Sequence, residues 1–125
     1  GTAALAKAID HLKKGDLVLI YPEGTRTLTG KMNRAKTGAA RLALAAKVPV
    51  VPMGIINTFE MLPKGKKIIK FGKKAELNVG KPLYFDKYYG MDDNKEVIRK
   101  ITTIIMNEIA KLANKKYEFD QEDLK

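Results

Sequence analysis

Residues 17–21, with the sequence LVLIY, constrain the fold more than any other part of this chain. All five residues are apolar, so the run shows no alternation of apolar and polar residues. This pattern is typical of a strand that is buried on both faces, as in a parallel sheet covered by helices. Pro22 ends the run, because proline has no N–H to donate to a sheet ladder. We therefore expect a buried strand at 17–21.

Predicted helices lie on both sides of this strand. Residues 3–14 carry an apolar stripe at helical spacing and stop at Gly15, and residues 38–47 are rich in alanine and leucine. Residues 48–56 are apolar again and predict a second buried strand, which two prolines interrupt. The long polar stretch between the strand at 17–21 and the second helix is a predicted functional loop.

The second half of the chain begins with two short strands, 66–71 and 75–79, whose alternation predicts a hairpin with one buried face. Residues 81–85 form an extended exit from the second strand. This order of strands and helices predicts a single domain, 1–125, of the α/β class, with a sheet, flanking helices and a right-handed crossover.

A long helix follows at about 93–113. Asp93 with Glu96 three residues later resembles a capping box, and we expect it to start the helix. The helix carries one apolar stripe, which should pack on the sheet. The stripe consists of Ile98, Ile101, Ile105, Ile109 and Leu112. The polar residues 118–125 predict a frayed tail.

Composition excludes several classes of protein. The 125 residues contain no Cys, which excludes a disulfide scaffold, a thiolate zinc site and a cysteine nucleophile. The single His and the lack of clustered carboxylates argue against a metalloenzyme, and neither Gly-Lys pair has the context of a phosphate-binding P-loop. A membrane-spanning helix needs about 20 apolar residues, and no apolar run in this chain approaches that length. The chain begins without Met and directly with a predicted helix, so we expect a piece of a longer protein.

The positive charge is concentrated in one part of the chain. The formal net charge is +10, and residues 1–90 hold 17 basic and 6 acidic side chains, against 7 and 8 in residues 91–125. Two interpretations are open, an anionic partner or a solvated lysine surface. A nucleic-acid-binding module is the main alternative function, although four Arg, no Trp and no recognised RNA-binding motif argue against it, and we expect no nucleic-acid partner.

A candidate anion site follows the first predicted strand. In open α/β sheets, ligands bind beyond the carboxyl ends of the strands. Arg26 offers two parallel donors to a phosphate, Glu23 can hold that guanidinium, and Gly24 lets the backbone approach closely. Thr25 adds a hydroxyl donor, and Lys36 is a second cation for the same anion. A turn with a local Glu–Arg ion pair is the alternative interpretation.

Three ordered sequence blocks resemble the glycerophospholipid acyltransferase family. Residues 21–27, YPEGTRT, resemble the signature FPEGTRS, and residues 48–53, VPVVPM, resemble a later block of alternating valine and proline. Residues 36–43, KTGAARLA, lie between them and resemble the stretch K-x-G-[AG]-x-x-L-A. The sequence LKKG at 12–15 matches the L-x-x-G that commonly precedes the first block. The resemblance covers about residues 5–85 and departs from the family pattern at Tyr21, Thr27 and Met53.

The resemblance implies acyl transfer from acyl-CoA or acyl-carrier protein to the free hydroxyl of lysophosphatidate, which gives phosphatidate in phospholipid biosynthesis. Glycerol 3-phosphate and related lysolipids stay alternative acceptors. It also implies that Glu23 and Arg26 hold the acceptor phosphate and that Val48, Pro49 and Pro52 have an acyl-donor or structural role. The family needs no metal or other cofactor. We expect the whole protein at the cytoplasmic face of a membrane, and these residues alone to be soluble.

The family uses a His-x4-Asp dyad, in which His deprotonates the acceptor hydroxyl and Asp orients the imidazole. His11 and Asp16 have this spacing. In the family, however, a much longer stretch separates the dyad from the EGTR block, and Asp16 would lie at the opposite end of the strand from the candidate site, about 15 Å away. We therefore expect this match to be coincidental, the dyad to lie upstream, and no catalytic residue in this chain. The chain alone should be inactive.

A lysine cluster lies on the predicted hairpin, at Lys64, Lys66, Lys67, Lys70, Lys73 and Lys74. It could contact anionic headgroups at a membrane surface or the phosphates of coenzyme A. Alternatively, these lysines keep an edge hairpin soluble. A non-catalytic lipid-phosphate-binding remnant is a third interpretation of the whole chain.

Overall fold

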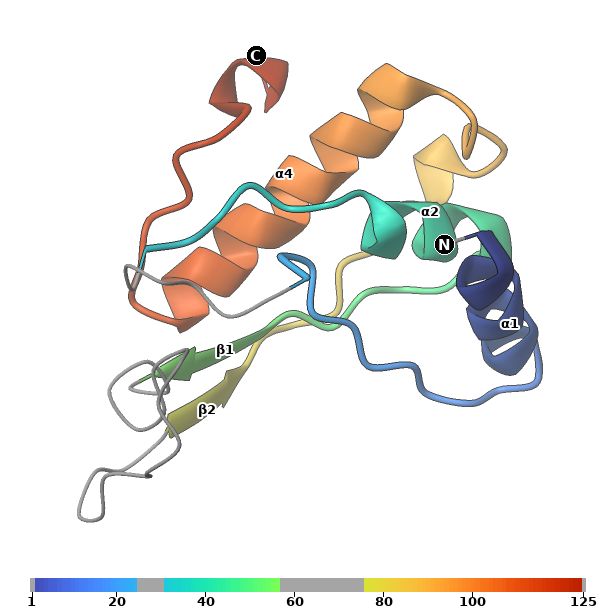
Figure 1. Ribbon diagram of the computed structural model, residues 1–125, viewed down its shortest axis with the longest axis horizontal. Coiled ribbons are helices and arrows are strands. Elements are labelled where there is room, and N and C mark those ends of the chain that lie inside the picture. Colours follow the sequence, from blue (N-terminus) through green and yellow to red (C-terminus); the bar gives the residue numbers. More distant parts are fainter. Residues whose placement is uncertain (1, 25–30, 57–75, 125) are drawn as a thin grey trace.

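One long helix, α4, crosses the molecule, and the other elements pack around it (Figure 1). The computed structural model describes residues 2–24, 31–56 and 76–124. Three elements, α2, β1 and η2, each contact α4, while α1 packs on α2. The elements are α1 (Thr2–Lys13), α2 (Gly38–Ala46), β1 (Met53–Ile56), β2 (Glu76–Val79), the 3-10 helix η1 (Asp86–Tyr88), α4 (Lys95–Leu112) and the 3-10 helix η2 (Gln121–Leu124).

The start of α4 differs by one residue from the predicted cap. Asn94, not Asp93, caps the helix, and its Oδ1 accepts hydrogen bonds from the backbone N–H groups of Glu96 and Val97, both at 3.1 Å. Asparagine is as good a cap as aspartate, because either side-chain oxygen satisfies N–H groups that lack a helical partner. The predicted capping box is therefore wrong, whereas the predicted helix is confirmed.

Helix α4 contributes side chains to two buried clusters. The first cluster joins α4 to α2 and to Phe85, which lies in the segment between β2 and η1. Its members are Ala40, Leu44, Phe85, Ile98, Ile101 and Ile105. The second joins α4 to the segment before α2 and to the C-terminal tail, and its members are Met32, Ala35, Met106, Ala110 and Tyr117. Burial of these side chains is the main driving force for packing around α4.

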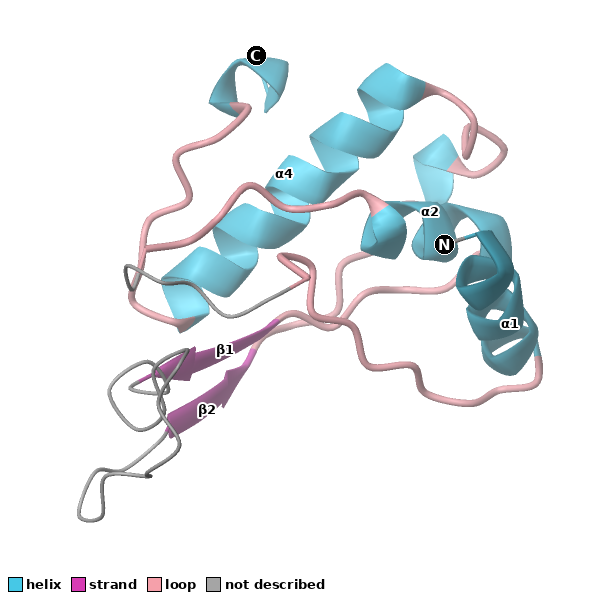
Figure 2. Ribbon diagram, viewed as in Figure 1, coloured by secondary structure: helices cyan, strands magenta, loops and turns pink. Residues whose placement is uncertain are grey.

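The sheet that the structure describes has two antiparallel strands, β1 and β2 (Figure 2). Gly54 of β1 lies against the end of α4, so close that an added Cβ would overlap the backbone of Leu112 and Ala113. The strand predicted at 75–79 is confirmed as β2 for residues 76–79, and its partner here is β1. Its predicted buried face is wrong, because Leu77 and Val79 are 60% and 59% exposed. The other predicted hairpin strand, 66–71, lies outside the described residues.

The second predicted strand, 48–56, is correct only for its last four residues, Met53–Ile56. Val50 makes an isolated bridge to Leu83, through hydrogen bonds of 3.0 and 2.7 Å. Pro49 and Pro52 flank this bridge and have no N–H to extend it into a ladder.

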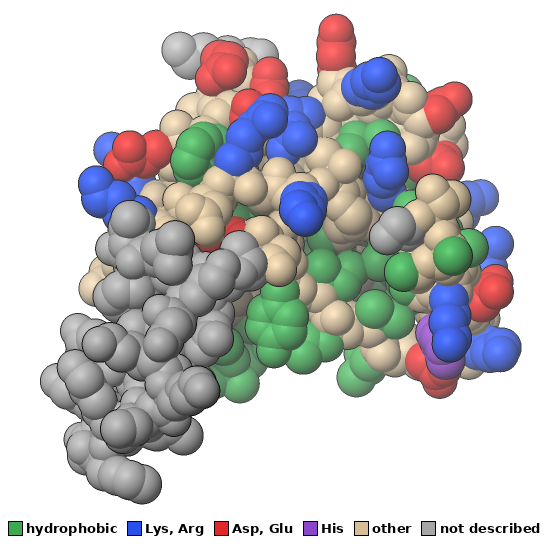
Figure 3. All heavy atoms as spheres, in the orientation of Figure 1, with side chains coloured by type: hydrophobic (Ala, Val, Ile, Leu, Met, Phe, Trp, Pro, Cys, Tyr) green, Lys and Arg blue, Asp and Glu red, His purple; other side chains and the backbone are tan. Residues whose placement is uncertain are grey.

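The prediction of a buried strand at 17–21 is wrong. The segment is extended but joins no sheet among the described residues, and Leu17 and Tyr21 are 100% and 71% exposed. Val18 and Ile20 are only half-buried. A strand needs a neighbour to pair its backbone groups, and the described part of the chain places none beside this segment. Figure 3 shows hydrophobic side chains gathered along the lower edge of the molecule, where Figure 1 places these residues.

The helix predictions and the α/β class are confirmed. The predicted crossover is not found in the described sheet, which is one antiparallel pair without residues 17–21. The predicted helices 3–14 and 38–47 correspond to α1 and α2, and Lys47 ends α2 in the left-handed conformation. The predicted frayed tail is instead held by contacts with α4, from the residues before η2 and from η2 itself. Within the described residues, no helix is both long and apolar enough to cross a bilayer.

Candidate functional site

The site predicted at the EGTR block begins with a tight turn at residues 21–24. The N–H of Gly24 donates a 2.9 Å hydrogen bond to the carbonyl of Tyr21, and Gly24 has φ +76°. Proline suits the second position of such a turn because its φ is already near the required value. Glycine accepts a positive φ without steric cost. The sequence YPEG therefore folds this turn locally.

A second segment, residues 33–36, lies against the turn. The N–H of Asn33 donates to Oε2 of Glu23 at 2.7 Å, and the N–H of Lys36 donates to the carbonyl of Pro22 at 2.9 Å. These two bonds hold both the side chain of Glu23 and the backbone beside it. They fix the half-buried carboxylate of Glu23 at the base of the turn.

The side chain of Lys36 lies across Gly24. A Cβ added to Gly24 would be 3.3 Å from both Cε and Nζ of Lys36, which is tighter than ordinary van der Waals contact. Lys36 is exposed, so its ammonium group is open to solvent beside the turn. A cation beside a glycine turn can bind an anion through the ammonium group and nearby backbone.

The structure thus brings together three of the five predicted phosphate-binding residues: Glu23, Gly24 and Lys36. The other two, Thr25 and Arg26, lie outside the described residues, as do the six lysines between 64 and 74. The described residues contain no group of three or more His, Asp or Glu side chains that could hold a metal ion.

Val48, Pro49 and Pro52 connect α2 to β1. The N–H of Val48 donates to the carbonyl of Ala43 at the end of α2, and the carbonyl of Pro52 accepts from Gly80 at 2.9 Å. Pro52 is buried, whereas Pro49 is exposed. These contacts are structural, and an acyl-donor role for the three residues stays a prediction.

His11 and Asp16 form an exposed contact at the end of α1. Nδ1 of His11 lies 2.9 Å from Oδ2 of Asp16, and the two side chains are 49% and 54% exposed. Sequence reasoning did not anticipate this contact, which orients the imidazole much as the carboxylate of a catalytic dyad does. The whole extended segment 17–21 separates the pair from the turn (Figure 1).

Sequence reasoning also missed the residues that support the turn from behind. Asn33 acts through its backbone, which no side-chain pattern can indicate. Tyr117 and Asp120, which contact the neighbouring residues 34 and 35, are distant in sequence. The one signal for Tyr117 was the pair of aromatic residues, Tyr117 and Phe119, in a largely polar tail, since aromatic side chains there suggest burial.

The chain is similar to known acyltransferases. The family model described as "Acyltransferase" matches residues 1–56. A chloroplastic 1-acyl-sn-glycerol-3-phosphate acyltransferase of Brassica napus is 34% identical over 66% of this chain and 24% of its own length. A 1-acyl-sn-glycerol-3-phosphate acyltransferase of Bacillus subtilis is 31% identical over 92% of this chain and 54% of its own length.

A solved structure also has the same fold. The 1-acyl-sn-glycerophosphate acyltransferase PlsC of Thermotoga maritima superposes with a TM-score of 0.71 and 28% identity, over 90% of this chain and 47% of that one. The chain therefore spans about half the length, or less, of these similar proteins.

Proposed function

This chain belongs to the acyltransferase family, and on that premise we propose that it supplies the acceptor-phosphate-binding half of a 1-acyl-sn-glycerol-3-phosphate acyltransferase. The whole enzyme would transfer an acyl group from acyl-CoA or acyl-carrier protein to the free hydroxyl of lysophosphatidate. The product would be phosphatidate, and the reaction would belong to phospholipid synthesis.

The observation that carries the proposal is the arrangement of Lys36 over the turn at Gly24. Lys36 is exposed, and its ammonium group lies beside Gly24, the residue that Thr25 and Arg26 follow in the sequence. A phosphate monoester needs more than one cationic donor, and the guanidinium of Arg26 would be the second. Glu23, held by Asn33, would brace that guanidinium.

A His-Asp dyad outside these residues would accept the proton of the acceptor hydroxyl. The exposed contact between His11 and Asp16 would be structural, because the segment 17–21 separates it from the phosphate site. In this proposal the 125 residues alone bind a phosphomonoester but transfer no acyl group.

The test uses an active acyltransferase that carries these residues. Lys36→Met should raise KM for lysophosphatidate about 10-fold or more, because a charge-assisted contact contributes about 1.5–3 kcal/mol. Lys36→Arg should restore much of the affinity. The matched control is Lys7→Met, which removes an exposed lysine from α1 and should leave KM unchanged.

His11→Ala in the same enzyme tests the placement of the dyad. Loss of a general base lowers turnover by about 10²-fold or more. We expect kcat of His11→Ala to change less than about 2-fold, far less than the loss of a general base would cause. A fall in kcat of the larger size would place His11 in the catalytic machinery.

An unchanged KM in Lys36→Met and Arg26→Ala would contradict the proposed phosphate site.

A further inference from the structure

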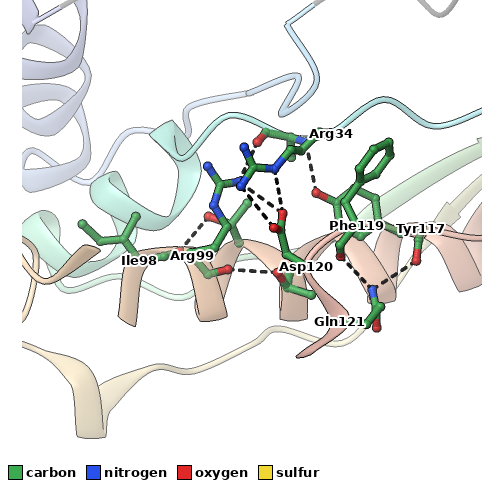
Figure 4. A network of polar contacts seen from close by, with 10 residues as sticks. Arg34, Ile98, Arg99, Tyr117, Phe119, Asp120 and Gln121 are labelled. Carbon is green, nitrogen blue, oxygen red and sulfur yellow. Dashed lines mark hydrogen bonds and ion pairs between the residues drawn. The ribbon is translucent and has the colours of Figure 1, made fainter. Parts of the chain in front are cut away.

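The segment that carries Lys36 is held on its far side by the C-terminal tail. Figure 4 shows a network of polar contacts in which residues 34 and 35 meet Arg99 of α4 and two residues of the tail, Tyr117 and Asp120. The proposed phosphate site uses none of these three side chains. The network therefore needs an explanation of its own.

Both backbone polar groups of Ala35 are held by side chains. Its N–H donates to the hydroxyl of Tyr117 at 3.1 Å, and its carbonyl accepts from Nη1 of Arg99 at 2.9 Å. Ala35 and Tyr117 are each only 3% exposed. Burial raises the pKa of the Tyr117 hydroxyl above its ordinary value, so the neutral hydroxyl remains the partner of this N–H.

Arg34, the preceding residue, binds Asp120 through two hydrogen bonds. Nε donates to Oδ2 at 2.9 Å and Nη2 to Oδ1 at 3.1 Å, which is the paired geometry that fixes a guanidinium in one orientation. Nη1 of Arg99 lies 3.8 Å from Oδ2 of the same carboxylate. The side chain of Asp120 is 14% exposed and that of Arg34 is 54% exposed, so the pair is open to solvent on the Arg34 side.

The tail that presents these groups is itself fixed. The amide of Gln121 exchanges hydrogen bonds with Asn107 of α4, at 3.1 and 2.9 Å, and also donates to the carbonyl of Tyr117 at 3.1 Å. Asp120 has φ +55°, a conformation that aspartate and asparagine accept more readily than most residues. The tail is thus a rigid support on α4.

The residues on either side of the supported pair make the contacts of the site. Asn33 donates to Glu23, and Lys36 donates to Pro22 and lies across Gly24. In this four-residue segment the two outer residues, 33 and 36, contact the turn, whereas the two inner residues, 34 and 35, are held by α4 and the tail. A displacement of the tail would be transmitted to the ammonium group of Lys36 over one or two residues.

We propose that Tyr117 and Asp120 are positioning residues for the acceptor phosphate: they hold residues 34 and 35 so that Lys36 and Glu23 stay in the geometry that binds it. This inference rests on the proposed function. Misplacement of a binding group by about 1 Å is enough to weaken its contribution strongly.

The variants Tyr117→Phe and Asp120→Asn remove the polar contacts with the least change of shape. The phenylalanine keeps the ring in its buried cluster, and the asparagine keeps the tolerance for a positive φ. In an active acyltransferase that carries these residues, each should raise KM for lysophosphatidate about 3- to 10-fold, the size expected for one lost hydrogen bond. KM for the acyl donor and kcat should stay within about 2-fold of the parent values.

The matched control is Glu108→Gln, which breaks an exposed 3.1 Å ion pair with Lys111 on the same helix, far from the turn in sequence. It should leave every kinetic constant unchanged. Thermal unfolding of each variant measures the loss of stability separately from the loss of affinity.

A double variant distinguishes positioning from a general structural role. If Tyr117 acts through Lys36, then Tyr117→Phe should change KM for lysophosphatidate less than 2-fold, roughly, in a Lys36→Met background. Effects that multiply fully would overturn the inference. So would a lower Tm with an unchanged KM in both single variants.

The outcomes also separate this inference from the proposed function. A raised KM in Lys36→Met, together with parent values in Tyr117→Phe and Asp120→Asn, would overturn the positioning role and leave the phosphate site intact. An unchanged KM in Lys36→Met itself would overturn the site and, with it, the positioning role.

Discussion

Apolar side chains are buried around α4 but exposed along the extended segment 17–21 and the β1–β2 pair. On the α4 side, Ile101 and Met106 are no more than 1% exposed. On the other side, Leu19 is 65% exposed and Val79 is 59% exposed. The exposed apolar side chains there are Leu17, Leu19, Tyr21, Val51, Met53, Ile55, Leu77 and Val79.

The difference shows that an apolar sequence specifies burial only where another element covers it. Helix α4 satisfies its own backbone hydrogen bonds and needs only side-chain contacts, which α2, residues 32–35 and the tail provide. The segment 17–21 needs a neighbouring strand as well as a covering layer. In the described residues it has no neighbouring strand, and only Val18 and Ile20 are half-buried, although this segment is the more apolar of the two sequences.

The largest expected effect tests this contrast directly. Ile101→Ala should cost about 2–5 kcal/mol of unfolding free energy, because it leaves a cavity in the first cluster. Leu19→Ala should cost no more than about 0.5 kcal/mol, because its side chain already contacts water. Urea unfolding of the chain measures both. A similar loss in the two variants would show that segment 17–21 is packed in solution, and the contrast would not hold.

An intermediate effect is expected where the two regions meet. Gly54→Ala would force a methyl group into the backbone of Leu112 and Ala113, and we expect a loss of about 1–3 kcal/mol as β1 moves away from α4. Gly38→Ala is the control, since nothing lies within 4 Å of an added Cβ there and alanine favours helix α2. Equal stability of the two variants would mean that β1 does not pack on α4.

The smallest expected effect concerns the ion pair between Arg34 and Asp120. Arg34, through its two hydrogen bonds, holds the pKa of the Asp120 carboxyl below its ordinary value of 3.8. A carboxyl with a lowered folded-state pKa stabilises the fold above its unfolded pKa, and this contribution is lost as the pH falls through the folded pKa.

We therefore expect the parent chain to lose more stability than Asp120→Asn between roughly pH 5 and pH 2. The difference should be below about 1 kcal/mol, because Arg34 is half-exposed and solvent screens the pair. Urea unfolding across this range measures it, and Arg34→Met should reduce the same dependence, because only the weaker contribution of Arg99 then lowers the pKa of Asp120. Parallel curves for all three chains would contradict the role of this pair.

Local signals predicted the helices and part of the site. The helical spacing of Ile98, Ile101 and Ile105 located α4. The candidate anion site was placed directly after Pro22, where the structure has a turn with a positive φ at Gly24. Lys36 was expected to share the anion with this turn, and the structure places it across Gly24. Each of these features depends on residues close together in sequence, where spacing and backbone preference are sufficient.

Features that depend on distant partners were not predictable in the same way. Ala35 and Tyr117 are 82 residues apart, and Arg34 and Asp120 are 86 apart. A polar tail with one tyrosine resembles a solvated terminus in sequence, so a frayed end was expected. Only the three-dimensional arrangement shows that its hydroxyl and carboxylate meet residues 34 and 35.

The sequence by itself therefore determined the helices, the glycine turn and the excess of positive charge, because each is set by local geometry or composition. Tertiary structure alone decided that residues 17–21 join no described strand and that the tail supports the segment carrying Lys36. The physical reason is that strand pairing and long-range hydrogen bonds need a partner at the correct distance in space, and no residue specifies its partner by type alone.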